Sequence, residues 1–115
     1  SSDLEYRKDL GLPEPGMHRL IHESYRLLDL ITFFTIAGGK ESRAWILRRG
    51  QNAWEAAGKV HTDIQRGFIR AEVVPQRVLV AEGGVAGARA QGSVRLEGKE
   101  YVVQDGDVLT FRFNL

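Results

Sequence analysis

The sequence predicts an α+β fold in which a mixed β-sheet wraps over one central helix, the arrangement called a β-grasp. Three observations predict it. Short segments rich in β-branched and aromatic residues, typical of strands, lie on both sides of a single helical segment at 52–60. Glycine and aspartate mark tight turns between the last strand segments. A separate amphipathic segment precedes the first strand, so the 115 residues predict one domain with an attached helix.

The first helix and the first two strands follow from local patterns. Residues 13–16 (Pro-Glu-Pro-Gly) predict a helix start, because proline is tolerated in a first turn. From Met17 to Leu28 apolar residues recur at helical spacing, which predicts an amphipathic helix of about three turns. Residues 30–36 then predict a buried strand, and after a turn at Gly38-Gly39-Lys40, residues 43–48 predict a second strand.

The middle of the chain predicts the central helix and a third strand. Asn52 is a good N-cap for a helix that runs to Val60. Residues 69–74 are strongly β-forming, and Pro75 ends that strand.

The last third predicts irregular structure followed by short strands. A short amphipathic segment at 78–80 leads into residues 83–92, which are mainly small and favour a surface loop or a poorly packed helix. Residues 93–96, 101–103 and 108–113 predict strands, with tight turns at Gly98 and at Asp105-Gly106-Asp107.

Composition narrows the class of protein. The hydrophobic share of 43% and the charged share of 27% are those of a folded soluble protein. No stretch reaches the ~20 apolar residues of a membrane-spanning helix, and the first ten residues lack the apolar core of a signal peptide. The chain has no cysteine, which excludes disulfides, thiolate catalysis and cysteine-rich zinc sites. We therefore expect a cytoplasmic protein without membrane contact.

The charge pattern permits anion binding without requiring it. A net charge of +1 is too small to indicate nucleic-acid binding by itself. Arginine outnumbers lysine twelve to four, which favours bidentate contacts to phosphate or carboxylate if a ligand exists. A solvated surface that happens to be rich in arginine is the alternative.

Two patterns resemble sites for nucleotide or metal, and both are incomplete. Gly39-Lys40 imitates the end of a phosphate-binding P-loop, but the motif needs glycine where Phe34 stands and serine or threonine where Glu41 stands. We therefore expect no NTP hydrolysis and no bound cofactor in this chain. His18 and His22 have the spacing of two helical zinc ligands, but a third ligand is not evident and we expect no metal site.

Two further motifs allow a structural reading. His61-Thr62-Asp63 would suit acid–base chemistry, but the sequence offers no recognisable nucleophile. We favour a turn after the central helix in which Thr62 or Asp63 accepts backbone N–H bonds. Gly84-Val85-Ala86-Gly87 has the Gly-x-x-Gly form of an RNA-contacting loop without its usual flanking elements, so a linker is favoured.

The best candidates for binding are basic residues around the end of the central helix and the end of the second strand. They are Lys59, His61, Arg66, Arg70, Arg48 and Arg49. Arginine contacts to phosphate would give sequence-independent, salt-sensitive affinity. Trp54 and Phe68 would stack on bases if exposed, although core positions are favoured for both. Strand alternation places Phe68 and Arg70 on one face and Ile69 on the other, so one member of the pair must break the pattern.

Several runs of residues resemble, in order, the C-terminal part of the YchF/Obg-like ATPases, and they are Glu41–Trp45, Val60–Asp63, Gly67–Val73, Glu97–Tyr101, Asp105–Val108 and Phe111–Leu115. The similarity extends from about Leu12 to Leu115. The His-Thr-Asp step and the late Gly-Asp turn also resemble TGS domains of other proteins.

The resemblance implies a ubiquitin-like β-grasp, or TGS domain, over residues 33–115. It implies that residues 1–32 resemble the end of a nucleotide-binding domain that the chain itself lacks. The parent family binds ATP or GTP with magnesium, whereas this part is expected to be a non-catalytic module that binds the ribosome, RNA or another partner. An intramolecular regulatory domain, contacting the parent's nucleotide-binding domain and controlling its ATPase activity, is the alternative. A free-standing hydrolase has no supporting constellation of residues.

Overall fold

The computed structural model describes residues 15–37 and 41–115 and divides the chain into two units. The first unit, residues 1–30, contains helix α2 (Pro15–Leu27), which confirms the predicted amphipathic helix. Its apolar residues Met17 and Leu20 are exposed. The predicted start at Pro13 and the predicted turn at 38–40 lie outside the described residues.

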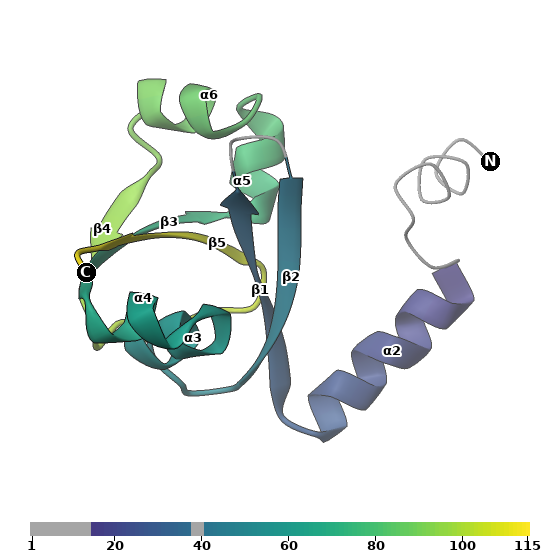
Figure 1. Cartoon of the computed structure of the whole chain (residues 1–115). Helices are drawn as coiled ribbons and strands as arrows, with labels where there is room; N and C mark the ends of the chain where they lie inside the picture. The colour runs from purple at the N-terminus through teal and green to yellow at the C-terminus, as the bar shows by residue number, and fades with distance from the viewer. Residues whose placement is uncertain (1–14, 38–40) are drawn as a thin grey trace. The chain divides into compact units, whose positions relative to one another are not determined.

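The second unit, residues 31–115, is built on a five-stranded mixed sheet in the order β2-β1-β5-β3-β4. The strands are β1 (Leu30–Ala37), β2 (Glu41–Arg48), β3 (Phe68–Pro75), β4 (Arg95–Glu97) and β5 (Asp107–Phe113). The last strand lies at the centre of the sheet, parallel to β1 and antiparallel to β3 (Figure 1). The fold class is thus a mixture of helices and a mixed sheet, as predicted.

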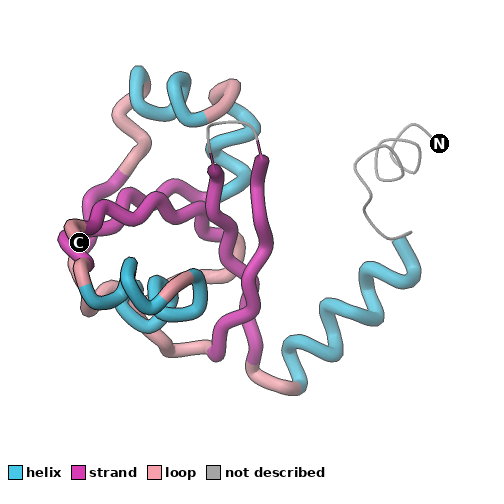
Figure 2. Tube along the Cα trace, viewed as in Figure 1, coloured by secondary structure: helices cyan, strands magenta, loops and turns pink. Residues whose placement is uncertain are grey.

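Helices cover the two faces of this sheet unequally (Figure 2). On one face, α3 (Ala53–Val60) and the short α4 (Thr62–Arg66) pack over the main core. On the opposite face, α5 (Gln76–Ala81) and α6 (Val85–Ala90) pack over a smaller cluster. Because strand side chains alternate between faces, β1, β3 and β5 supply residues to both clusters.

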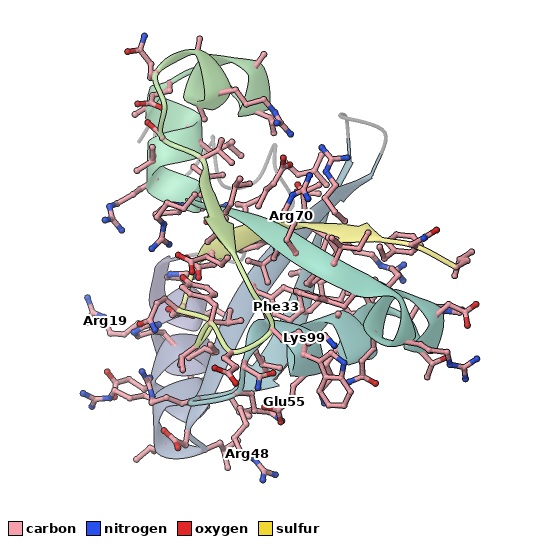
Figure 3. All side chains as sticks on the ribbon, turned by 90° about the vertical axis from the view of Figure 1, so that its left-hand side faces the viewer. Arg19, Phe33, Arg48, Glu55, Arg70 and Lys99 are labelled. Atoms are coloured by element: carbon pink, nitrogen blue, oxygen red, sulfur yellow. The ribbon has the colours of Figure 1, made fainter. Side chains whose placement is uncertain are left out.

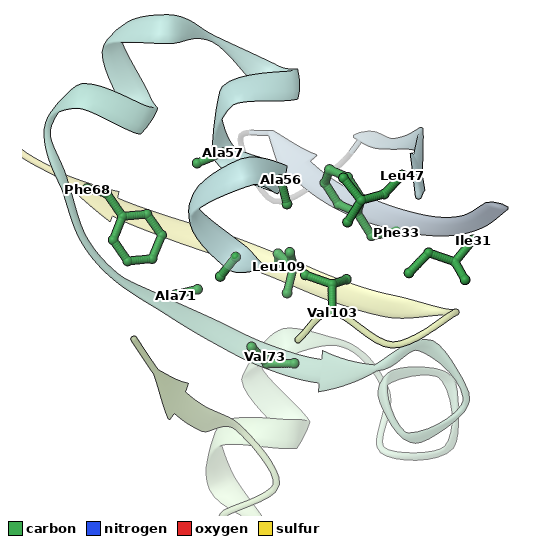
Figure 4. Packing of buried hydrophobic residues seen from close by; sticks show 11 residues of the cluster. Ile31, Phe33, Leu47, Ala56, Ala57, Phe68, Ala71, Val73, Val103 and Leu109 are labelled. Atoms are coloured by element: carbon green, nitrogen blue, oxygen red, sulfur yellow. The ribbon is translucent and has the colours of Figure 1, made fainter. Parts of the chain in front are cut away.

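The main core forms where α3 lies against the sheet. Ala53, Ala56 and Ala57 have no exposed surface, and these small side chains let the helix approach the strands closely. Figure 4 shows Ala56 and Ala57 on the helix side of Leu109, with Phe33 beside Ala56. Apolar burial of this kind is the dominant favourable term in folding.

The N-terminus of α3 is held by a complete capping box. The Asn52 side chain accepts the Glu55 N–H at 2.8 Å, and the Glu55 carboxylate accepts the Asn52 N–H at 3.2 Å. Both bonds satisfy backbone donors that a helix start otherwise leaves unpaired. The predicted N-cap is therefore confirmed.

One prediction for the last third was wrong. Residues 101–103 form no strand, because their backbone groups bond to the loop and helix start at 51–53 instead of a neighbouring strand. Tyr101 O accepts the Ala53 N–H at 2.8 Å, and the Val103 N–H donates to Gln51 O at 3.1 Å. Residues 83–92 contain the helix α6, one of the two predicted alternatives, and Ala88 is the residue of α6 that is buried against the sheet.

Candidate functional site

Three of the predicted basic residues lie close together in sequence and structure, at the junction of α3 and α4. Lys59 is in the last turn of α3, His61 connects the helices, and Arg66 ends α4. All three are exposed, on the side of the sheet that α3 and α4 cover. They form a loose basic edge that solvent reaches freely.

His61 has a structural task at this junction. Its Nδ1 accepts the backbone N–H of Asp63 at 3.0 Å, which makes His61 the N-cap of α4. The expectation that Thr62 or Asp63 would accept backbone N–H bonds here was wrong, because the acceptor of the open N–H group, that of Asp63, is the His61 imidazole. The Asp63 carboxylate lies 3.7 Å from the same Nδ1.

Arg48 is the last residue of β2, Arg49 follows it, and both are exposed. Figure 3 places Arg48 well away from Arg70, at the other end of the sheet. The structure therefore does not join the β2 end to the remaining predicted residues in one surface.

Arg70 lies on the face of the sheet opposite α3 and α4. Its neighbour Ala71 packs into the main core, and alternation sends Arg70 to the other side. An irregularity in the β3–β5 register between Phe68 and Arg70 lets Phe68 turn into the main core while Ile69 is exposed. This bulge resolves the conflict in the strand pattern, and it separates Arg70 from Arg66.

Phe68 and Trp54 differ in exposure. Phe68 is buried in the main core, as favoured, and is therefore unavailable to a base. Trp54 was expected in the core but is 40% exposed on α3, where its backbone carbonyl accepts a bond from the Gln65 side chain.

A buried carboxylate surrounded by arginines occupies the face that carries Arg70. We call Glu72, Arg70, Arg89 and Arg112 the Glu72 cluster. Arg89 of α6 donates to both Glu72 oxygens, at 3.2 and 2.7 Å, and Arg112 of β5 donates to Oε2 at 3.2 Å. The hydrogen bonds from Arg89 hold the pKa of Glu72 below its ordinary value, despite the opposing effect of burial.

Sequence reasoning missed Glu72, Arg89 and Arg112 as members of a site. Alternation along β3 and β5 was the available signal, because it places Glu72 with Arg70 and Thr110 with Arg112. Their meeting depends on the β3–β5 register, in which Arg70 stands opposite Arg112. That register links Arg70 to a residue 42 positions later and is not visible in the local pattern.

A second polar network ties the loop before β5 to β4. The Tyr101 hydroxyl donates to Asp107 Oδ2 at 2.6 Å and accepts from Arg95 at 3.1 Å. Burial, followed by the bond to Asp107, raises the pKa of Tyr101 to about 12. A phenol that stays protonated and bonded in this way supports the loop rather than acting as a base.

The described residues include an open pocket but no cluster of metal ligands. Among them, no group of three or more His, Asp or Glu side chains could hold a metal ion. An open pocket of about 540 Å³ lies between β1 and the α5–α6 turn, and Arg89 is the single charged residue in its mainly aliphatic and glycine lining. No helix in the described part of the chain is long and apolar enough to cross a membrane. The Gly-x-x-Gly motif begins α6, and a Cβ at Gly87 would collide with the Glu82 carbonyl, so this glycine is required for packing.

Two curated relatives of this chain carry the same name. A Bacillus subtilis protein named “Ribosome-binding ATPase YchF” is 56% identical over 110 residues, covering 96% of this chain and 30% of the relative. A Pasteurella multocida protein of the same name is 51% identical over 112 residues, covering 97% of this chain and 31% of the relative. The chain thus spans about a third of the length of these curated relatives.

A solved structure and a family description agree with these relatives. The Schizosaccharomyces pombe YchF GTPase superposes with a TM-score of 0.75 at 33% identity, covering 95% of this chain and 28% of that one. The family YchF-GTPase_C, described as “Protein of unknown function (DUF933)”, matches residues 30–114. The chain therefore belongs to the YchF-GTPase_C family.

Proposed function

We propose that this chain is a non-catalytic binding module, a ubiquitin-like β-grasp of the TGS type, that helps an Obg-like ATP- or GTP-binding protein engage the ribosome or RNA. The observation that carries the proposal is the 56% identity to a relative named for ribosome binding, over nearly the whole chain. The order of elements supports the β-grasp assignment, with α3 packed over a mixed sheet. We take residues 1–32 as the end of the preceding domain and 33–115 as the module.

Under this proposal, the module and the rest of such a protein have different functions. The phosphate-binding loop, magnesium and nucleotide would belong to the parent's own nucleotide-binding domain, and this module would supply contacts to a partner. If the partner is the ribosome, the protein acts in the cytoplasm. Candidate contacts are the exposed residues Lys59, His61 and Arg66 on one side and Arg70 on the other.

Co-sedimentation with purified ribosomes tests this function. We expect the chain to pellet with ribosomes at low salt and to be released as salt rises, because phosphate contacts weaken by counterion release. Arg66→Ala and Arg70→Ala are compared separately, since the two residues lie on opposite faces of the sheet. Absence of pelleting at low salt would remove the ribosome as the partner.

An intramolecular regulatory role is the second candidate, and the exposed apolar residues of α2 favour it. Met17, Leu20 and Leu27 are all more than half exposed, a surface suited to packing against a further domain. In that case, removing residues 33–115 from a full-length relative would change its ATPase rate in the absence of ribosomes. An unchanged rate would leave the ribosome-binding role as the better account.

A further inference from the structure

We propose that the Glu72 cluster binds the phosphate backbone of RNA. This inference rests on the proposed function and deepens it, because it assigns the RNA contact to the face of the sheet opposite α3 and α4. The charge, geometry and accessibility of Arg70, Arg89 and Arg112 suit this contact.

The charges of the cluster are unbalanced. Glu72 supplies one negative charge, and both of its carboxylate oxygens are already engaged by Arg89 and Arg112. Arg70 makes no ion pair with any described residue. Two guanidinium groups therefore share one carboxylate and the third, that of Arg70, has no described counter-ion, so an excess of positive charge remains on this part of the sheet.

The strand register adds a like-charge pair. Arg70 of β3 stands directly opposite Arg112 of β5, and like charges in directly opposite positions destabilise a sheet. An anion held between the two guanidinium groups removes that repulsion. Phosphate suits the position, since each guanidinium presents a planar fork that matches two phosphate oxygens.

The cluster is ordered before any ligand arrives. The Glu72 side chain is only 9% exposed, and it holds Arg89 and Arg112, whose side chains are 45% and 47% exposed. Each guanidinium has five N–H donors, and the bonds to Glu72 use two from Arg89 and one from Arg112. The remaining donors belong to side chains that reach solvent, so binding costs less conformational entropy than it would for free arginines.

The surrounding surface leaves room for a polymer. The helices α5 and α6 pack over the end of the face that holds Val74 and Val108. Beyond them Leu96, which pairs with Glu72 across the sheet, is 64% exposed. Figure 3 shows Arg70 on the sheet side away from Glu55 of α3.

RNA is favoured over an acidic protein because this part of the face lacks a large buried anchor. Protein interfaces concentrate their energy in central aromatic or arginine anchors that fill pockets, whereas Arg70 and Arg112 lie at exposed strand positions and the pocket beside Arg89 is lined mainly by glycine and aliphatic residues. Phosphate contacts need no pocket and add up along a backbone.

Fluorescence anisotropy with a labelled single-stranded RNA tests the assignment. The RNA is longer than about 16 nucleotides, the upper end of what one small single-strand-binding domain covers. The variants are Arg70→Gln, Arg70→Gln/Arg112→Gln, and the matched control Lys59→Gln/Arg66→Gln, which removes equal charge from the opposite face. We expect the double sheet-face variant to weaken binding about tenfold or more at low salt. We also expect it to lower the salt slope by about 1.4, that is, about 0.7 for each lost phosphate contact.

The single variant keeps the test valid if the double variant unfolds, because Arg70 has no ion pair with a described residue to lose. An equal loss in the control, or no loss in Arg70→Gln, overturns the assignment.

The same proteins are pelleted with ribosomes. If the chain pellets but the sheet-face variants pellet equally well, the cluster is not the contact and the proposed function stands. If the sheet-face variants lose pelleting while the wild-type chain ignores RNA, the cluster binds a ribosomal protein and the RNA assignment fails. If RNA binds through the cluster but ribosomes do not pellet the chain, the proposed ribosome contact fails and the phosphate site stands.

Discussion

At the scale of single residues, Glu72 shows how one buried charge can organise its surroundings. A carboxylate taken out of water needs partners, and Glu72 finds them on two other elements, Arg89 of α6 and Arg112 of β5. Removing only the charge of such a group leaves its arginine partners unneutralised, which costs more than removing an exposed pair. The residue therefore links β3, β5 and α6.

We expect the stability of the chain to fall in acid partly through Glu72. Its pKa is lower in the folded state than in the unfolded state. Between these two pKa values the unfolded state binds more protons, so stability is present above the unfolded pKa and is lost as the pH falls through the folded pKa. Urea unfolding of the wild type and of Glu72→Gln, measured from neutral pH to about pH 3, should show a shallower acid loss for the variant. Parallel curves would mean that Glu72 does not carry this dependence.

At the scale of elements, α3 depends on both its cap and its small buried face. Asn52→Ala removes the acceptor for the Glu55 N–H, and we expect a loss of about 1 kcal/mol in unfolding free energy. Asn52→Ser keeps a capping oxygen and should lose less. Chemical denaturation of both variants measures the difference, and equal losses would place the effect in packing rather than in the cap.

The elements also show what the sequence could predict. Patterns that are local were sufficient: the apolar spacing of α2, the Asn52 cap and the β-forming run of β3 all predicted real elements. Residues 101–103 were misread, because their strand-like composition serves tertiary bonds to the start of α3.

The predicted basic residues were identified singly, and their grouping failed for a physical reason. A bulge near Ile69 and the register of distant strands decide which face an arginine occupies. Arg70 therefore lies on the face opposite Arg66 and next to Arg112.

At the scale of the whole molecule, the chain consists of two units of unequal size, and the sheet with its cores lies in residues 31–115. We expect a shortened chain of residues 31–115 to unfold cooperatively, because both hydrophobic clusters are formed by its own residues. Differential scanning calorimetry of the full and shortened chains measures this. A shortened chain without a cooperative transition would show that the first unit contributes to the stability of the second.

The central position of β5 has a consequence during synthesis. Residues 107–113 come late in the sequence, yet β1 and β3 bond to opposite edges of this strand. A growing chain that has only reached α6 holds the two halves of the sheet with no strand between them, and both still expose apolar surface. Residues 107–113 must therefore emerge from the ribosome before the complete sheet can form. Folding of the module thus waits for the synthesis of β5.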